Sequence, residues 1–487
     1  MMPARMSAMQ RLLIAAVVVA LAVSWATHVT SSPVDKDSAQ SVQMAVNLAY
    51  HGVISLDERA PFTPSDYREP VPVLVTAAGI RLMDVILGPA QAPAYFSGER
   101  LKYLKLQNIL WLALLSFGVY WAVEVVTGSF AAALAALLIA GTVFSANRWA
   151  SGMLNDLYTD LPAGAVLVLA STALAVALTR NRRGYCVLAG LLFALLTLIK
   201  AAVMYVFIGT LGLLVCVYVL YRSRLDLGTA LRNLTIMTLA FICTVGPWML
   251  RNRVELGSFQ VAQRAGVVLM VRAVKDLMTR EEYVGAFYVW APQRLQPVLG
   301  RLLGFGPADL QRGGRLQHLN RSPDSDFAAD DIAAEQAGRP QDAIAYYRRG
   351  RAERMKLEHE LVAAHTPNAE VATDKLLQQR AMNIIKAHPL QHIATTVPFL
   401  WRGATVAFPI LALALVLATR HRRYDIALLA LPAFGLVMFY ALLSHFIPRY
   451  SVPVRPVLVA LLVIAAQLGW QAFRQRGRRD PSIVVMR

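Results

Sequence analysis

Apolar runs of about 20 residues recur along most of this chain, and each could cross the hydrocarbon core of a bilayer as a helix. Of the 487 residues, 56% are hydrophobic and 16% are charged, whereas a soluble domain has about 25% charged residues. Backbone N–H and C=O groups in lipid must bond within their own segment, which favours α-helices. The pattern therefore predicts an all-α polytopic membrane protein and excludes a soluble enzyme and a disordered chain.

The apolar runs predict ten membrane spans in three modules. In chain order the spans are 12–28, 104–126, 129–146, 161–179, 184–199, 201–220, 232–250, 396–418, 424–444 and 452–471. The first seven belong to an N-terminal membrane module, residues 1–250, with a first outer loop at 29–103. A soluble insert at 251–395 follows, and the C-terminal module, residues 396–487, holds the last three spans and a basic tail.

Two segments outside these spans have their own expected structure. The stretch 71–90 is apolar, but Arg81 and Asp84 near its middle are costly in hydrocarbon, so we expect a helix at the interface. The insert carries helical patterns near 333–363 and 370–388. It is therefore expected to be mostly helical.

The basic residues indicate the orientation. The net charge is +18, and the Lys and Arg residues cluster beside spans at 180–183, 222–224, 420–423 and 474–479. Such clusters are typical of cytoplasmic loops, so both termini are expected in the cytoplasm and both soluble segments on the outer, periplasmic face. No zinc-finger or RNA-binding signature accompanies the charge. We therefore expect membrane lipids as partners and no nucleic acid.

Two acidic groups are expected on the outer face. Asp35 and Asp37 follow the first span, and Asp156 and Asp160 precede the fourth. Each group could simply cap a helix, because Asp is a favoured N-cap residue. If both groups open into one cavity, they could instead supply a general base and an orienting carboxylate or a ligand for a divalent cation. The use of a metal stays open.

Cations at the outer ends of spans complement these carboxylates. The set comprises Arg68, Lys200, Arg251, Arg449 and Arg455. The positive-inside rule disfavours cations there, which suggests an anionic ligand such as a membrane phosphate. Snorkelling to lipid headgroups is the alternative. His445, also at the end of a span, could act as an acid–base group or serve packing alone.

Short motifs in a particular order resemble those of bacterial GT-C glycosyltransferases related to protein O-mannosyltransferases and to the lipid A aminoarabinose transferase. The segment DSAQSVQMAVNLAYHG, which begins at Asp37, is similar to the acidic motif after the first span, with Ser41 in place of the family's tyrosine. In YREP, Glu69 occupies a position that is often Lys in the lipid A enzymes. The remaining similar elements are DLP at 160–162, TLIK at 197–200, PWMLRN at 247–252, AHP at 387–389 and RYSVP at 449–453.

The resemblance implies a GT-C-like fold and an inverting transfer of a sugar from a polyprenyl-phosphate donor to a lipid, glycan or protein acceptor. The host would be the bacterial cytoplasmic membrane, as part of cell-envelope synthesis. The resemblance implies that Asp37 is the general base and that Asp160 orients the acceptor or a cation. The residues implied to contact the lipid phosphate are Arg68, Lys200, Arg251 and Arg449. Supporting roles would fall to Asp35, Asp156 and His445. A transporter or flippase for a lipid-linked sugar or an anion, and a non-catalytic GT-C-like scaffold, remain the alternatives. No Walker A, H-E-x-x-H or G-x-S-x-G motif supports ATP-driven transport, zinc proteolysis or serine hydrolysis.

Overall fold

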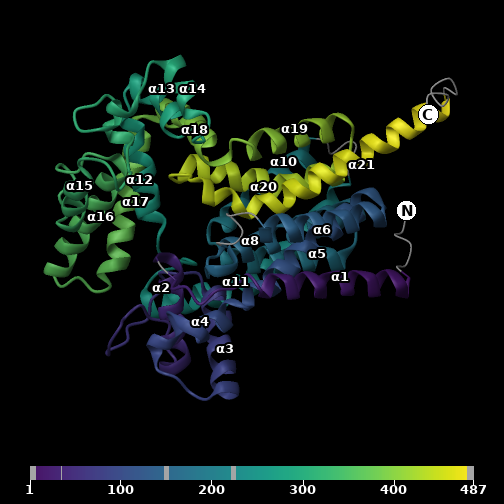
Figure 1. Cartoon of the computed structure of the whole chain (residues 1–487), viewed down its shortest axis with the longest axis horizontal. Coiled ribbons are helices and arrows are strands. Elements are labelled where there is room, and N and C mark those ends of the chain that lie inside the picture. Colours follow the sequence, from purple (N-terminus) through teal and green to yellow (C-terminus); the bar gives the residue numbers. More distant parts are fainter. Residues whose placement is uncertain (1–6, 35, 147–152, 221–225, 480–487) are drawn as a thin grey trace. The chain divides into compact units, whose positions relative to one another are not determined.

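The structure is a computed structural model that describes residues 7–34, 36–146, 153–220 and 226–479. Every regular element in these ranges is a helix (Figure 1). The chain divides into two compact units. Unit 1 consists of Met1–Trp248, Pro409–Leu436 and Val452–Arg487, and unit 2 consists of Met249–Phe408 and Val437–Ser451.

Eight of the described helical segments are long and apolar enough to cross a membrane, or nine if one bent pair counts as a span. They are α1 (Ala8–Ala26), α3 (Pro70–Leu87), α4 and α5 together (Gly98–Thr127), α8 (Asp160–Thr179), α10 (Ala202–Leu220), α11 (Leu227–Leu256), α20 (Tyr424–Leu443) and the segment Pro448–Gln475, which holds η5 (Pro448–Val454) and most of α21 (Arg455–Arg479). Two shorter apolar helices, α6 (Phe130–Ala146) and α9 (Arg183–Ile199), match the predicted spans 129–146 and 184–199. The predicted all-α polytopic membrane fold is confirmed.

Helix α8 forms the centre of unit 1, and 89% of the residues in its most apolar stretch are buried. Small residues let its neighbours approach closely, as is common between membrane helices. A Cβ added at Gly118 of α5 would lie 2.6 Å from Cγ1 of Val168 in α8. Helices α1, α5 and α6 pack against one another nearby (Figure 1). This packing buries the first turn of α8, where Asp160 lies.

Helix α3 covers most of the stretch predicted to be an interfacial helix. The carboxylate of Asp84, in the last turn of this helix, accepts hydrogen bonds from Tyr50 at 2.9 Å, from Arg100 at 3.1 Å and from Tyr95. The Arg81 guanidinium lies 6.0 Å from the ring centre of Tyr50. Apolar side chains of the same helix are exposed, namely Leu82, Val85 and Ile86. A helix with paired charges and a separate apolar face fits an interface, and that placement stays a prediction.

The predicted span 396–418 is wrong as a single continuous helix. Helix α18 (Pro389–Ala404) ends three residues before α19 (Ala407–Arg420) begins. Pro409 lies in the first turn of α19, where its missing N–H costs nothing. In a continuous helix its ring would clash with the carbonyl of Thr405, which explains the break at 405–406.

Unit 2 contains the helices of the predicted insert. They are α12 (Ala265–Ala273), η2 (Val274–Leu277), α13 (Arg280–Val289), α14 (Gln296–Leu303), η3 (Pro307–Leu310), η4 (Gln317–Leu319), α15 (Ala328–Gln336), α16 (Tyr346–Ala363) and α17 (Ala369–Ala387). The helical pattern near 370–388 corresponds to α17, but the pattern 333–363 is split between α15 and α16. The chain turns at Gly338, whose φ is +64°. A glycine adopts that left-handed conformation without the strain of a side chain.

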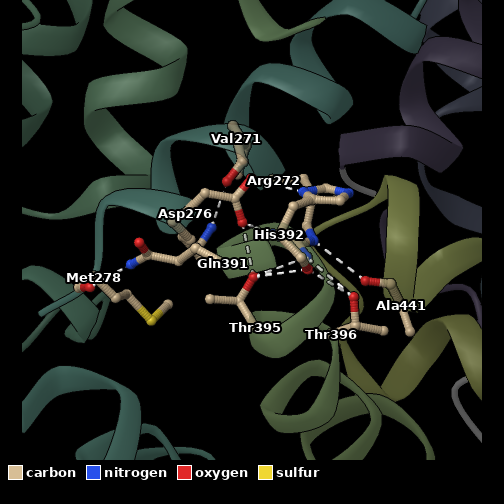
Figure 2. Close-up of polar contacts among 10 residues, drawn as sticks. Val271, Arg272, Asp276, Met278, Gln391, His392, Thr395, Thr396 and Ala441 are labelled. Atoms are coloured by element: carbon tan, nitrogen blue, oxygen red, sulfur yellow. Dashed lines mark hydrogen bonds and ion pairs between the residues drawn. The ribbon is translucent and has the colours of Figure 1, made fainter. Parts of the chain in front are cut away.

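A buried ion network joins η2 to α18 within unit 2 (Figure 2). Arg272 and Asp276 form an ion pair of 2.6 Å in which neither side chain is exposed. Asp276 also accepts from Thr395 at 2.7 Å and contacts Nδ1 of His392 at 2.6 Å. Arg272 donates to the carbonyl oxygens of His392, at 2.9 Å, and Ala441, at 3.2 Å. Each buried charge is therefore both paired and hydrogen-bonded, as a low-dielectric interior requires.

Replacing Asp276 with Asn should destabilise the protein strongly, because it leaves the Arg272 guanidinium buried without its counter-charge. Removal of one partner of a buried ion pair costs about 3–5 kcal/mol. The midpoint of thermal unfolding of the purified protein measures this loss. The matched control is Arg312→Gln, which breaks an exposed pair with Asp330 and should cost less than about 1 kcal/mol. Equal midpoints for the two variants would contradict a stabilising role for the network.

Candidate functional site

The first part of the site lies where α2 (Lys36–His51) meets the start of α3 in unit 1. The two helices pack through apolar side chains at helical spacing, namely Val42, Ala45 and Ala49 of α2 and Val73, Ala77 and Ile80 of α3. This packing places Asp37, in the first turn of α2, beside Arg68. Nη2 of Arg68 lies 2.5 Å from Oδ1 of Asp37. The Arg68 side chain is only 6% exposed and that of Asp37 is 30% exposed, so the carboxylate remains reachable from outside.

A second side chain of α2 shares the same guanidinium. Arg68 also donates to Oε1 of Gln40, which follows Asp37 by three residues and so lies on the same face of the helix. The guanidinium therefore holds the Asp37 carboxylate in one orientation relative to α2. Gln40 was not among the predicted site residues, although its i+3 spacing from Asp37 was a signal that could have identified it.

The second part of the site is a buried ion pair between Asp160 and Lys200. Asp160 is the first residue of α8, and Lys200 caps the C-terminal end of α9. Nζ of Lys200 lies 2.7 Å from Oδ1 of Asp160, and the two side chains are 9% and 3% exposed. The positive end of the α8 dipole also favours a carboxylate at this position. The sequence marked Lys200 as a cation that is costly in the membrane, and Asp160 is the partner that offsets this cost.

A hydrogen bond links the segments that carry the two ion pairs. Oε1 of Glu69, the residue after Arg68, accepts from the backbone N–H of Ala201, the residue after Lys200, at 3.3 Å. Ala201 immediately precedes α10, so the Glu69 carboxylate binds an N–H group that the helix leaves unsatisfied. This contact gives Glu69 a clear role at the position where the resembling lipid A enzymes often have Lys.

A third cation lies close to the buried pair. Arg455 is the first residue of α21, and its positive charge interacts with the Asp160 carboxylate. The segment around it packs on α8, because a Cβ added at Gly164 would lie 3.3 Å from Cγ of Pro456. The charged groups that meet here are Asp37, Glu69 and Asp160 on the acidic side and Arg68, Lys200 and Arg455 on the basic side. Among the described contacts, three carboxylates thus meet three basic groups here.

The two predicted catalytic carboxylates differ in what they can do chemically. Asp37 is partly exposed and held in place, so it could accept a proton from a bound hydroxyl. Asp160 is 3% exposed and engaged with Lys200. Its geometry suits orientation of the Lys200 ammonium better than direct contact with a substrate.

The remaining predicted residues are Asp35, Asp156, Arg251, Arg449 and His445. The backbone carbonyl of Asp156, in unit 1, accepts from Nδ2 of Asn108 at 3.1 Å. Asp35 lies outside the described residues. Unit 2 contains Arg251, Arg449 and His445. In the parts of the chain that the structure describes, no three His, Cys, Asp or Glu side chains come together as a metal site.

Arg251 is the one predicted phosphate ligand that is already engaged within its own helix. It lies near the end of α11, and its Nη2 is 2.5 Å from Oε2 of Glu255. Its other terminal nitrogen donates to Oδ1 of Asn252 at 3.0 Å. A contact with phosphate would therefore compete with Glu255.

A double-mutant cycle tests the buried pair. Asp160→Asn and Lys200→Met each leave one buried charge without its partner, so each should destabilise the protein by about 3–5 kcal/mol. The double variant Asp160→Asn/Lys200→Met removes both charges and should recover much of that loss. The four unfolding midpoints provide the measurement. If the stability lost by the double variant equalled the sum of the losses in the two single variants, direct pairing would be contradicted.

Comparisons with known proteins give a likeness among solved structures. No protein-family model and no curated protein matches the chain. Among solved structures, it is similar to the crystal structure of ArnT from Cupriavidus metallidurans bound to undecaprenyl phosphate, with a TM-score of 0.38 and 13% identity. That likeness covers 92% of this chain and 77% of the other.

Proposed function

We propose that this chain is a GT-C-type glycosyltransferase that moves a sugar from a polyprenyl-phosphate donor to an acceptor hydroxyl on the outer face of a bacterial cytoplasmic membrane. The observation that carries the proposal is the partly exposed Asp37 carboxylate, oriented by Arg68 and linked through Glu69 to the buried Lys200–Asp160 pair. The order of the motifs along the chain supports the same function. The acceptor would be a lipid, a glycan or a protein.

Asp37 would act as the general base. Its carboxylate accepts the proton of the acceptor hydroxyl as the oxygen attacks the anomeric carbon. The bond from that carbon to the phosphate oxygen breaks, and its electron pair leaves with the polyprenyl phosphate. Attack from the face opposite the leaving group inverts the configuration. The leaving group is already an anion, so the reaction needs little general-acid assistance.

The departing phosphate would be stabilised by positive charge. Arg68 offers a planar fork that matches phosphate oxygens, and Lys200 offers a point charge positioned by Asp160. Such preorganised charges lower the barrier because they need no reorientation during the reaction. Arg251 and Arg449 are the further candidates for contact with the phosphate that the sequence suggests.

The replacement of the family's tyrosine by Ser41 is compatible with this arrangement. Ser41 is 4% exposed, and its hydroxyl donates to the backbone carbonyl of Asp37 at 3.1 Å. The serine thus supports the first turn of α2 from within the helix. The loss of an aromatic ring at this position leaves the base and its arginine in place.

Replacing Asp37 with Asn should abolish transfer, because the amide keeps the shape of the side chain but cannot accept the proton. General-base catalysis contributes about 10²–10⁴-fold, so we expect turnover to fall by at least about 100-fold. The assay uses protein reconstituted in lipid, a panel of radiolabelled polyprenyl-phosphate sugars, and release of free polyprenyl phosphate as the readout.

The matched control is Glu99→Gln, which alters an acidic residue of the same outer loop whose side chain is 66% exposed. It should retain wild-type turnover. Wild-type turnover in Asp37→Asn would refute the assignment of the base. If the wild-type protein binds a donor saturably but releases no polyprenyl phosphate from any of the panel, the function is instead transport or scaffolding.

A further inference from the structure

Unit 2 gathers cations that have no carboxylate partner. Lys275 of η2 is 3% exposed, and its Nζ donates to the backbone carbonyl of Val271 at 2.7 Å. Arg402 of α18 donates to the backbone carbonyl of His445 at 3.4 Å. Among the described residues, neither side chain forms an ion pair with Asp or Glu, and the same holds for Arg321. The nearby Asp276 is engaged by the network of Figure 2.

Aromatic rings, rather than acids, surround these cations. The Arg321 guanidinium lies 4.1 Å from the ring centre of Tyr347, and that of Arg402 lies 4.7 Å from the ring centre of Trp290. Nζ of Lys275 lies 5.8 Å from the ring centre of Phe399. Cation–π contacts stabilise a cation without removing its charge. The guanidinium groups of Arg321 and Arg402 therefore keep their positive charge.

His445 connects the members of this cluster. Its ring lies 5.9 Å from that of Tyr347 and 5.4 Å from that of Tyr450, and its carbonyl accepts from Arg402. The side chain is 9% exposed, and its Nδ1 has no hydrogen-bond partner. A buried polar nitrogen without a partner costs free energy, so this atom is suited to bind a ligand.

The field at this position is strongly positive. Burial and the charges of Arg402, Arg321 and Arg272 hold the pKa of Lys275 well below its usual range. Burial and the charges of Lys275, Arg402 and Arg321 likewise hold the pKa of His445 well below its usual range, so its ring is neutral. Like charges that repel one another in a partly buried site favour the binding of an anion.

We propose that Lys275, Arg321, Arg402 and His445 form a binding site for the phosphate group of a phosphorylated ligand. Two guanidinium forks, one ammonium and one imidazole nitrogen match the oxygens of a phosphate monoester or diphosphate. The Arg321 side chain is exposed, so a ligand can reach the cluster. The site uses none of the residues of the Asp37 site in unit 1, and its test does not depend on the proposed sugar transfer.

Ligand-induced stabilisation tests this site in the full-length protein. The protein is placed in phosphatidylcholine nanodiscs in a buffer that contains no inorganic phosphate. Its unfolding midpoint is then followed during titration with inorganic phosphate or pyrophosphate at constant ionic strength. Binding to the folded state should raise the midpoint saturably. A second arm replaces part of the lipid with phosphatidic acid, whose headgroup is a phosphate monoester. A response to the soluble anions supports a free phosphate group as ligand, and a response to phosphatidic acid alone supports a lipid headgroup.

Variants separate binding from a structural role. In the absence of phosphate, Lys275→Met should raise the midpoint above that of wild type, because it removes a buried amine whose protonation the neighbouring cations oppose, whereas loss of a structural lysine would lower it. The same variant and Arg402→Gln should weaken the apparent affinity for phosphate about tenfold or more, since each removes a charge-assisted contact. Arg321→Gln alters an exposed side chain. It therefore allows phosphate affinity to be measured even if Lys275→Met or Arg402→Gln unfolds the protein. Arg294→Gln, an exposed arginine of the same unit, should respond to phosphate like wild type.

Three results would overturn the proposal. One is the absence of any response to phosphate, pyrophosphate or phosphatidic acid, and another is an equal response to sodium chloride at matched concentration. The third is an unchanged phosphate response in both Arg321→Gln and Arg402→Gln. Because the readout is binding and not turnover, an inactive Asp37→Asn variant or a failed transfer assay leaves these outcomes unaffected.

Discussion

A charge removed from water must find an opposite charge or several hydrogen bonds, and the arrangement of this protein depends on that constraint. In a chain with only 16% charged residues, each buried cation or carboxylate determines which helices can meet. Lys200 and Asp160 bring the junction of α9 and α10 to the first turn of α8 in unit 1. Arg272 and Asp276 tie η2 to α18 in unit 2. Burying each pair loses the hydration free energy of both charges, and only close contact between the two charges offsets that loss. Each pair therefore favours one arrangement of its helices.

The same constraint distinguishes the two clusters of charge. In unit 1 the groups around Asp37 and Asp160 are matched, which suits a site that handles a proton and orients its own side chains. In unit 2 the cluster of Lys275, Arg321 and Arg402 is unmatched, and aromatic rings hold it together. A matched site is stable without a ligand, whereas an unmatched one gains stability when an anion binds. This difference is the physical basis for assigning proton transfer to the first cluster, beside its proposed contact with the departing phosphate, and phosphate binding alone to the second.

Glu69 illustrates how a departure from a family pattern can be explained by structure. At the sequence level a carboxylate in place of a lysine appeared to weaken the predicted donor contact. In the structure the carboxylate binds the N–H of Ala201 and joins the Arg68 and Lys200 segments. The side chain thus contributes to the assembly of the site, although it does not supply positive charge.

The sequence alone determined the all-helical membrane fold and supplied the candidate site residues, whose roles stay predictions. Hydrophobic runs and charge placement are local properties, so the helices, the candidate carboxylates and the candidate cations could be predicted without coordinates. Errors arose where a break depends on local stereochemistry, as at Pro409, or on a turn glycine such as Gly338. Only the tertiary structure decided the partners: that Arg68 binds Asp37 and Gln40, that Lys200 binds Asp160, and that Lys275, Arg321 and Arg402 form no ion pair with an acid among the described residues. Pairing between residues far apart in the chain depends on how helices pack, and no local pattern in the sequence records it.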